Sequence, residues 1–220
     1  MAAPDFLDTI NEYNRDMFAP EDAVLKELER ELPKHGLPEI QISADVGRLL
    51  QFLVGLTPGK RALEIGTLGG YSGIWTARGM RPGGLFTTCE INDKHADFAQ
   101  SYFDKARLKV KVRILRGPGL ASLQALKKEA RFDFIFVDAD KETYPEYFKA
   151  ARPLLAKGGI IAADNTLRLL RRAGDITNAK TTDRSLLALR KYNALVAADK
   201  TLTSIALPLR DGLTVGHYRG

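Results

Sequence analysis

The residues with the clearest chemical potential are polar side chains that follow two apolar runs of the sequence. Asp138 comes directly after Phe132–Val137, and Asp164 and Asn165 come directly after Ile160–Ala163. If these runs are adjacent parallel strands, their carboxyl ends meet at the edge of the sheet where ligands usually bind. Carboxylate and amide oxygens, without His or Cys, suit Mg²⁺ or Ca²⁺. The pattern predicts a divalent-cation site, and the alternative is that the acids cap the following helices.

A glycine-rich loop, Gly66–Gly70, lies between a predicted strand and a predicted helix, where glycines let the backbone approach a ligand. Leu68 and Tyr71 occupy two glycine positions of the fingerprint G-x-G-x-x-G, which disfavours NAD. Glu64 precedes the loop and can accept from a ligand ammonium, while Glu90 ends the next strand, where an acid accepts from a ribose diol. The pair suits a nucleoside that carries an amino acid. The alternative interpretation is that, of Glu64 and Glu90, one caps a helix and the other is exposed to solvent.

Alternating strands and helices are expected to position these residues. From Arg61 onward, short apolar runs alternate with stretches of helical periodicity, the pattern of βαβ units in a mostly parallel sheet. Two final strands without an intervening helix predict an antiparallel hairpin at one end. The predicted strands are Ala62–Ile65, Leu85–Cys89, Val110–Leu115, Phe132–Val137, Ile160–Ala163, Thr201–Leu207 and Leu213–Tyr218, and the predicted helices are Tyr71–Arg78, Lys94–Arg107, Leu120–Glu129, Tyr144–Leu155 and Asp183–Ala198.

The first forty residues are expected to form a helical extension. Pro20 opens a helix signal, apolar residues follow at helical spacing, and Pro33 ends it, which predicts an amphipathic helix lying on the body or on a second subunit. A further helix is predicted from about Ser43 to Leu56. No repeat or long linker divides the chain. We therefore expect one domain over residues 1–220, with the extension at 1–40 and the core at 41–220.

The composition is that of an ordinary globular protein, with 220 residues, 45% hydrophobic and 27% charged. One cysteine, Cys89, excludes an intramolecular disulfide framework and a zinc site built on cysteine pairs. No apolar run approaches the roughly 20 residues of a membrane span, so neither a membrane anchor nor a secretory signal is expected. These features favour a cytoplasmic protein.

The formal net charge of +6 hints at an anionic partner such as nucleic acid, but it is unevenly distributed. The first forty residues carry four basic and ten acidic residues, whereas residues 166–220 carry ten basic and four acidic ones. Charged and apolar residues alternate over Lys109–Ile114. We favour an edge strand that basic side chains protect against unwanted pairing over a nucleic-acid-binding patch.

Four motifs together resemble the cation-dependent class I O-methyltransferases, the relatives of catechol and caffeoyl-CoA O-methyltransferases. They are E-I-G-T-x-G-G-Y-S, C-E-I-N, F-V-D-A-D-K and A-D-N, in that order. The similarity runs from about Ile42 to Tyr218 and includes the closing L-P-L-R-D-G-L-T. It implies a Rossmann-like α/β fold: a seven-stranded, mostly parallel sheet with a reversed C-terminal hairpin strand, helices on both faces, and Val110–Leu115 at an edge.

The resemblance also implies S-adenosyl-L-methionine and Mg²⁺, or another divalent cation, as cofactors. The implied roles are Glu64, Gly66, Thr67 and Ser72 at the methionine end of the cofactor, Glu90 at the ribose, Ile91 and Pro118 beside the adenine, Ile42 and Asp138 as further cofactor contacts, Asp138, Asp164 and Asn165 as metal ligands, and Lys141 as the general base.

The chemistry of methyl transfer supports these roles. A sulfonium methyl needs a phenolate nucleophile, and a divalent cation that binds both hydroxyls of a catechol stabilises that anion. A free lysine has a pKa near 10.4, so a lysine base working near pH 7 needs a shift of roughly three units, about 4 kcal/mol. A nearby cation and partial burial act in that direction. The alternative is that Lys141 is a plain surface lysine.

The leading hypothesis is methyl transfer to a small, phenolic, catechol-type substrate. A caffeoyl-CoA-like thioester or hydroxyuridine in tRNA remain alternatives, and a non-catalytic nucleic-acid-binding or scaffold protein is a third class. Arg168, Arg171 and Arg172 follow the predicted metal ligands, so we expect a lid there, in which Arg168 contacts an acidic substituent of the substrate. The acidic N-terminal helix suggests a homodimer.

Overall fold

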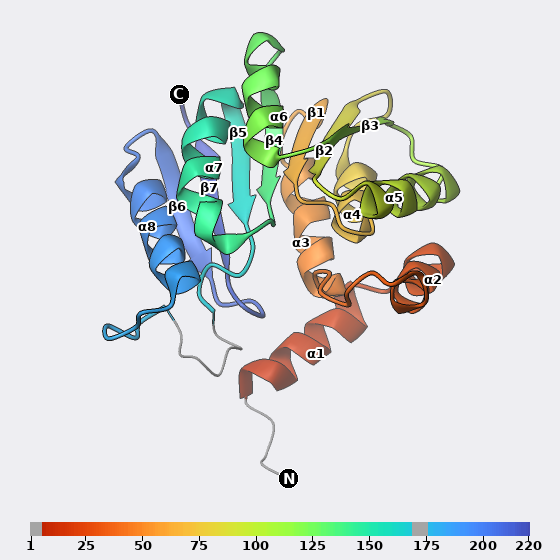
Figure 1. Cartoon of the computed structure of the whole chain (residues 1–220), viewed down its shortest axis with the longest axis horizontal. Coiled ribbons are helices and arrows are strands. Elements are labelled where there is room, and N and C mark those ends of the chain that lie inside the picture. The colour runs from red at the N-terminus through yellow and green to blue at the C-terminus, as the bar shows by residue number, and fades with distance from the viewer. Residues whose placement is uncertain (1–5, 169–175) are drawn as a thin grey trace.

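The computed structural model describes residues 6–168 and 176–220. Its described strands form one seven-stranded sheet in the order β3-β2-β1-β4-β5-β7-β6, in which β7 runs antiparallel to both of its neighbours (Figure 1). The predicted fold class is therefore confirmed, including the reversed strand. The strands are β1 (Arg61–Ile65), β2 (Leu85–Glu90), β3 (Lys111–Arg116), β4 (Phe132–Val137), β5 (Leu155–Ala163), β6 (Leu202–Leu207) and β7 (Leu213–Tyr218).

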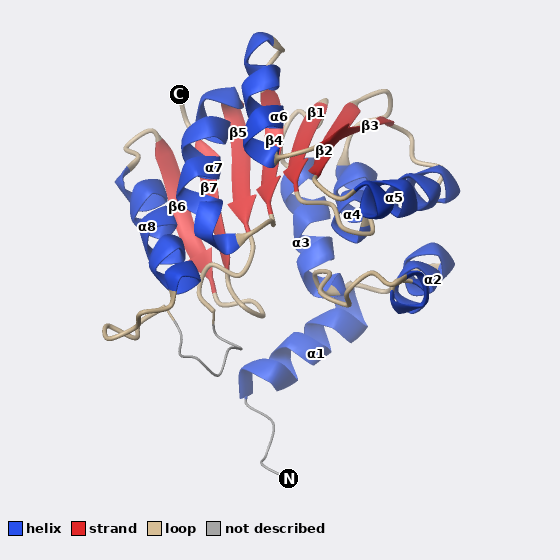
Figure 2. Ribbon diagram, in the orientation of Figure 1, coloured by secondary structure: helices blue, strands red, loops and turns tan. Residues whose placement is uncertain are grey.

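Helices cover both faces of the sheet (Figure 2). Residues 62 and 134 pack with α3, α4 and α5, while residues 63 and 135 pack with α6, α7 and α8. Because side chains alternate between the faces and both faces are covered, β1 and β4 have buried apolar side chains on both faces. The helices are α1 (Phe6–Phe18), α2 (Ala23–Glu31), α3 (Ala44–Gly55), α4 (Tyr71–Gly79), α5 (Asp93–Lys105), α6 (Gly119–Ala125), α7 (Tyr144–Ala151) and α8 (Arg184–Ala198).

The N-terminal extension contains two helices, of which only the second was predicted. Asp22 caps α2 by accepting a hydrogen bond from Leu25 N at 3.0 Å, so the helix begins after Pro20 rather than at it. The unpredicted α1 has polar residues on the side that meets the body, where Asn11 is only 4% exposed. Apolar periodicity could not reveal a helix that is held through polar contacts.

The region before the cation-site residues also departs from prediction. The predicted helix Tyr144–Leu155 ends at Ala151 and is followed by a short 3-10 turn, because Pro153 lacks the N–H that would continue the α-helix. The next strand then begins at Leu155 instead of Ile160. Gly158, with φ of +77°, lies within this longer strand, and its pairing with β4 shifts register near Phe132.

The strand predicted at the sheet edge does lie there, since β3 is the first strand in the order. Its two arginines have partners within the protein: Arg113 pairs with Glu129 at 2.9 Å, and Arg116 pairs with Asp93 at 3.0 Å. This arrangement agrees with the edge-strand interpretation of the alternating charges. Within residues 6–168 and 176–220, no helix is long and apolar enough to cross a membrane.

Candidate active site

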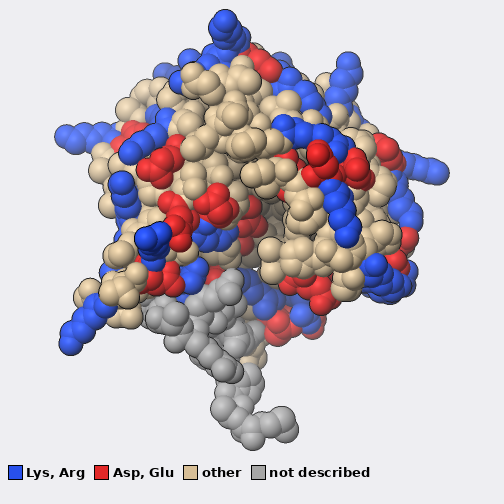
Figure 3. Space-filling view, viewed as in Figure 1, with Lys and Arg blue, Asp and Glu red and all other residues tan. Residues whose placement is uncertain are grey.

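A cavity of about 830 Å³ opens at the carboxyl ends of β1, β4 and β5. Figure 3 shows acidic side chains beside a hollow near the centre of the molecule. Parallel strands bring their carboxyl ends to one edge, which is the usual ligand side of such sheets. The lining residues are 39–43, Val46, 66–68, Tyr71, Ser72, 138–141, Asp164, Asn165, Arg210 and Asp211.

The glycine-rich loop forms one wall of the cavity and passes close to the end of β4. Gly66 has φ of +91°, a conformation that side chains disfavour, and an added Cβ would overlap the carbonyl oxygen of Asp138. Gly66 N donates to Cys89 O at 3.0 Å, and Asp138 N donates to Ile65 O at 2.9 Å. The loop therefore connects the ends of three neighbouring strands, and its backbone can approach a ligand closely.

Glu64 lies under this loop and is completely buried. Its carboxylate accepts hydrogen bonds from Ser72 Oγ at 2.6 Å and from Thr88 Oγ1 at 2.7 Å. Burial raises the pKa of Glu64 to about 7, although the two hydroxyl groups favour its charged form. Glu64 is thus a buried acid behind the loop, one hydrogen bond away from a residue of the cavity wall.

We expect Glu64→Gln to stabilise the ligand-free protein at pH 8 but not at pH 4.5. The ordinary pKa of 4.5 applies to the unfolded chain, so as the pH rises from 4.5 to 7 the unfolded state loses the Glu64 proton first, and stability falls. Above pH 7 the buried carboxylate of Glu64 is charged and lowers the stability of the protein by about 3 kcal/mol, whereas a glutamine stays uncharged and has no such cost. Urea unfolding at both pH values, in EDTA, measures the difference.

Glu129→Gln is the matched control, because Arg113 and then Arg61 hold the pKa of Glu129 below its usual range. Its substitution should lower stability at pH 8, the opposite sign. Equal stability of wild type and Glu64→Gln at pH 8 would contradict the penalty.

Glu90 anchors the same loop from the end of β2. Its carboxylate accepts from Leu68 N at 2.9 Å, from Thr67 N at 3.3 Å and from Asn92 N at 2.9 Å. Of the residues predicted to bind the cofactor, Ile42, Gly66, Thr67, Ser72 and Asp138 line the cavity, Glu64 and Glu90 lie behind the loop, and the exposed Ile91 and Pro118 lie outside the lining.

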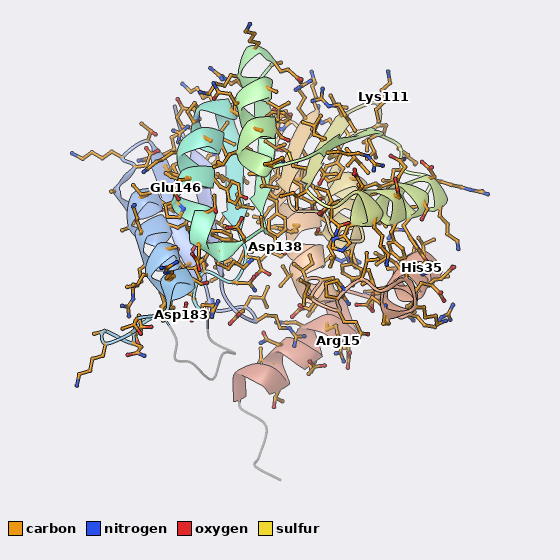
Figure 4. The ribbon with its side chains drawn as sticks, in the orientation of Figure 1. Arg15, His35, Lys111, Asp138, Glu146 and Asp183 are labelled. Atoms are coloured by element: carbon orange, nitrogen blue, oxygen red, sulfur yellow. The ribbon has the colours of Figure 1, made fainter. Side chains whose placement is uncertain are left out.

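The predicted metal ligands and the predicted base line the same cavity. Lys141 Nζ donates to Asp138 Oδ1 at 2.7 Å and to Tyr144 OH at 2.8 Å. The buried Tyr144 hydroxyl also lies 3.1 Å from Asp164 O, so it contacts both strand ends. Figure 4 shows Asp138 at the lower end of the sheet. The contacts hold the ammonium group of Lys141 beside the two carboxylates.

The donor set here fits a hard divalent cation. Asp164 is 6% exposed, and its Oδ1 has no hydrogen-bond partner among the described residues. Burial, followed by the charge of Asp138, raises the pKa of Asp164 to about 7. No group of three His, Cys, Asp or Glu side chains in the described residues has a metal-binding arrangement, so a third protein ligand would be the amide oxygen of Asn165.

Several residues of the cavity wall were not predicted from the sequence, among them the charged Arg210 and Asp211, which lie in the turn between β6 and β7. The turn belongs to the segment L-P-L-R-D-G-L-T, but a role for its charged residues could not be assigned from spacing alone. Backbone hydrogen bonds join the turn to the segment after Asn165, since Leu167 N and Arg168 N both donate to Asp211 O. Tertiary contact thus brings the turn to the cavity.

The expected substrate contact of Arg168 is not supported. Its side chain is 14% exposed, faces Asp183 at 3.6 Å, and does not line the cavity. Asp183 also caps α8 through Leu186 N, so Arg168 fastens the segment after Asn165 to that helix. The other two arginines of the predicted lid, Arg171 and Arg172, lie outside the described residues.

Comparison with known proteins agrees with this fold and cavity. A family model described as O-methyltransferase matches residues 15–218. A catechol O-methyltransferase of Niastella koreensis is 35% identical over 92% of this chain and 90% of its own length, and caffeoyl-CoA O-methyltransferase 2 of Petunia hybrida is 31% identical over 90% and 85%. The structure of an O-methyltransferase from Bacillus cereus in complex with SAH has a TM-score of 0.87 and 35% identity, covering 97% of this chain and all of that one.

A doubly wound sheet with a reversed last strand and a glycine-rich loop over its ligand edge defines a class I methyltransferase architecture. The matched length and identities place the chain more narrowly: it belongs to the O-methyltransferase family. The predicted family is confirmed, as is the predicted activity class of an S-adenosylmethionine-dependent O-methyltransferase.

Proposed function

We propose that the protein transfers the methyl group of S-adenosylmethionine to one hydroxyl of a small vicinal dihydroxyphenyl compound in an Mg²⁺-dependent reaction. The observation that carries this proposal is the cluster of Asp138, Lys141 and Asp164 in the wall of the cavity that the glycine-rich loop also lines. Hard oxygen donors beside a lysine suit a substrate with two adjacent phenolic oxygens. The catechol O-methyltransferase of Niastella koreensis supports the same substrate class.

The cofactor is assigned to the loop side of the cavity. The backbone of Gly66 and the side chains of Thr67 and Ser72 would hold its methionine end, with Glu64 acting through the Ser72 hydroxyl. Glu90 would accept from the ribose hydroxyls while it fixes the loop amides. Ile42 and Asp138 would supply further cavity contacts, and Ile91 and Pro118 would flank the adenine outside the cavity.

Asp138, Asp164 and Asn165 would hold the divalent cation, which when bound lowers the pKa of the substrate hydroxyls. Lys141 Nζ, held by Asp138 and Tyr144, would act in its neutral amine form and take the proton from the reacting hydroxyl to become an ammonium group. The phenolate oxygen forms a bond to the methyl carbon as the carbon–sulfur bond breaks, and the electron pair stays on sulfur in S-adenosylhomocysteine. The cavity walls align the two reactants.

A methylation assay of protocatechuate, caffeate, caffeoyl-CoA and tRNA, with Mg²⁺ or with EDTA, tests the proposal. We expect transfer to the small catechols with Mg²⁺ and its loss in EDTA, with recovery when Mg²⁺ is restored. Full activity in EDTA would contradict the metal requirement. Faster transfer to caffeoyl-CoA would favour the thioester, the second candidate, which the relative in Petunia hybrida supports.

We also propose a cytoplasmic homodimer composed of one methyltransferase domain per chain. Exposed apolar side chains on α1 support association: Tyr13, Met17 and Phe18 are each more than half exposed. A sedimentation mass near the 24.3 kDa of one chain would contradict the dimer.

A further inference from the structure

Arg210 joins three parts of the chain at the rim of the cavity. From the β6–β7 turn, its Nε donates to Asp45 Oδ2 at 2.8 Å, and its Nη1 donates to Glu12 Oε1 at 2.8 Å. Its Nη2 donates to Asn11 O at 3.3 Å. One guanidinium group therefore connects the turn to α1 and to the first turn of α3. The planar fork of arginine suits such a junction better than the single ammonium of lysine.

The junction is buried on its Asp45 side and pairs two carboxylates, Asp45 and Glu12, with Arg210. The side chain of Arg210 is 17% exposed and that of Asp45 only 4%. The second oxygen of Asp45 has no hydrogen-bond partner among the described residues, so Arg210 is the main compensation for this carboxylate. Glu12 is shared with Arg15 of the same helix. Removing the guanidinium would leave the buried Asp45 carboxylate without its arginine partner, while Glu12 would keep its ion pair with Arg15.

The turn that carries Arg210 also holds the backbone that follows the proposed metal ligands. Thr166 N donates to Gly212 O at 2.9 Å, and Leu167 N donates to Asp211 O at 3.1 Å. Gly212 has φ of +91°, and an added Cβ would lie 2.8 Å from Leu167 N. The turn and the segment after Asn165 are packed so closely that a shift of one moves the other.

The C-terminal end of α1 has a separate contact with the body, since Arg48 Nε donates to Phe18 O at 2.9 Å. Figure 4 shows α1, marked by Arg15, below the end of the sheet at which Asp138 lies. Arg210 thus attaches the middle of α1, at Asn11 and Glu12, to the side of the cavity that contains Asp164 and Asn165.

We propose that Arg210 is a positioning residue for the acceptor substrate, which holds α1 against the cavity rim and fixes the loop of the metal ligands. This inference rests on the proposed function for its kinetic consequences, but not for the attachment of α1. The cofactor side of the cavity, built on Glu64 and Glu90, has no contact with Arg210 among those described. Acceptor binding should therefore depend on Arg210 far more than cofactor binding does.

The test compares Arg210→Met with Arg152→Met. Arg152 is a matched control because its side chain is 16% exposed and its Nε donates to Asp199 Oδ2 at 2.8 Å, at a position remote from the cavity. In Arg210→Met we expect amides of α1 to exchange with solvent about tenfold faster, the acceptor KM to rise about tenfold, and the S-adenosylmethionine Kd to stay within about twofold. Arg152→Met should change none of the three.

Two further variants separate positioning from general loss of structure. Glu12→Gln should reproduce part of the faster exchange of α1, and adding it to Arg210→Met should have little further effect, because the two residues act through one contact. Arg210→Lys should restore the acceptor KM only in part, since an ammonium cannot reproduce the fork.

Unchanged exchange of α1 in Arg210→Met, or an equal rise of the KM in Arg152→Met, would overturn the inference. Hydrogen exchange requires neither a metal nor a substrate. A wild-type chain that methylates no catechol would therefore count against the proposed function, while exchange would still decide the role of Arg210 in holding α1.

Discussion

Replacing Lys141 with methionine should lower kcat by about 10²–10⁴-fold, the range expected for loss of a general base. The S-adenosylmethionine Kd should stay within about twofold, because the described contacts of Lys141 are with Asp138 and Tyr144 and not with the glycine-rich loop. Methionine preserves much of the length of the side chain, which is 17% exposed beside Asp138 and Tyr144. Single-turnover methyl transfer and calorimetric cofactor binding measure the two quantities separately.

A further variant and its control test whether Lys141 acts by accepting a proton or only through its positive charge. Lys141→Arg keeps the positive charge but cannot serve as a base near neutral pH, so it should be nearly as inactive as Lys141→Met. Lys149, exposed on α7, provides the control, and Lys149→Met should retain full activity. Substantial activity in Lys141→Arg would mean that the lysine acts only through its charge.

The second large effect is expected from Gly66→Ala, which should lower stability by roughly 2–5 kcal/mol. The backbone at Gly66 has φ of +91°, and the new Cβ would overlap the Asp138 carbonyl oxygen and lie 3.3 Å from Ala139 Cα. The substitution should therefore both strain the backbone of the loop and displace Asp138. For a chain of this size the melting temperature should fall by roughly 5–15 °C, and differential scanning calorimetry measures the shift.

Gly83→Ala separates the two causes. Gly83 also has positive φ, at +78°, but an added Cβ there would meet nothing within 4 Å. Gly83→Ala therefore strains the backbone without an overlap, and we expect this variant to be less stable than wild type by roughly 1–2 kcal/mol. If Gly66→Ala destabilises the protein no more than Gly83→Ala does, the close approach of the loop to β4 is not a constraint.

Much of the fold could be predicted because the chain encodes it locally. The mostly apolar and buried run Phe132–Val137 and the alternation over Lys109–Ile114 each indicate a strand and also its place in the sheet, central or at the edge. The adjacency of Asp138 and Asp164 then follows from the pairing of two parallel strands. A polar residue that directly follows a predicted strand can therefore be assigned to the site from the sequence alone.

The parts that could not be predicted depend on contacts between distant segments. The helix α1 is attached through Arg210, which is 198 residues after Glu12, and no periodicity within either segment reveals the contact. The side chain of Arg168 could turn toward the cavity or toward Asp183, and only the packed structure distinguishes the two. Glu90 was assigned to a ligand, yet the structure shows that it also accepts hydrogen bonds from two loop amides.

The contact between Arg210 and α1 has a consequence for the order of events during synthesis. Translation proceeds at about 5–20 residues per second, so the ribosome makes Arg210 on the order of 10–40 s after Glu12. Throughout that interval the contacts of Asn11 O and Glu12 with Arg210 cannot form. The reversed strand β7, also made late, inserts between β5 and β6. The helix α1 is thus made early, but its attachment to Arg210 can form only after most of the chain has been made.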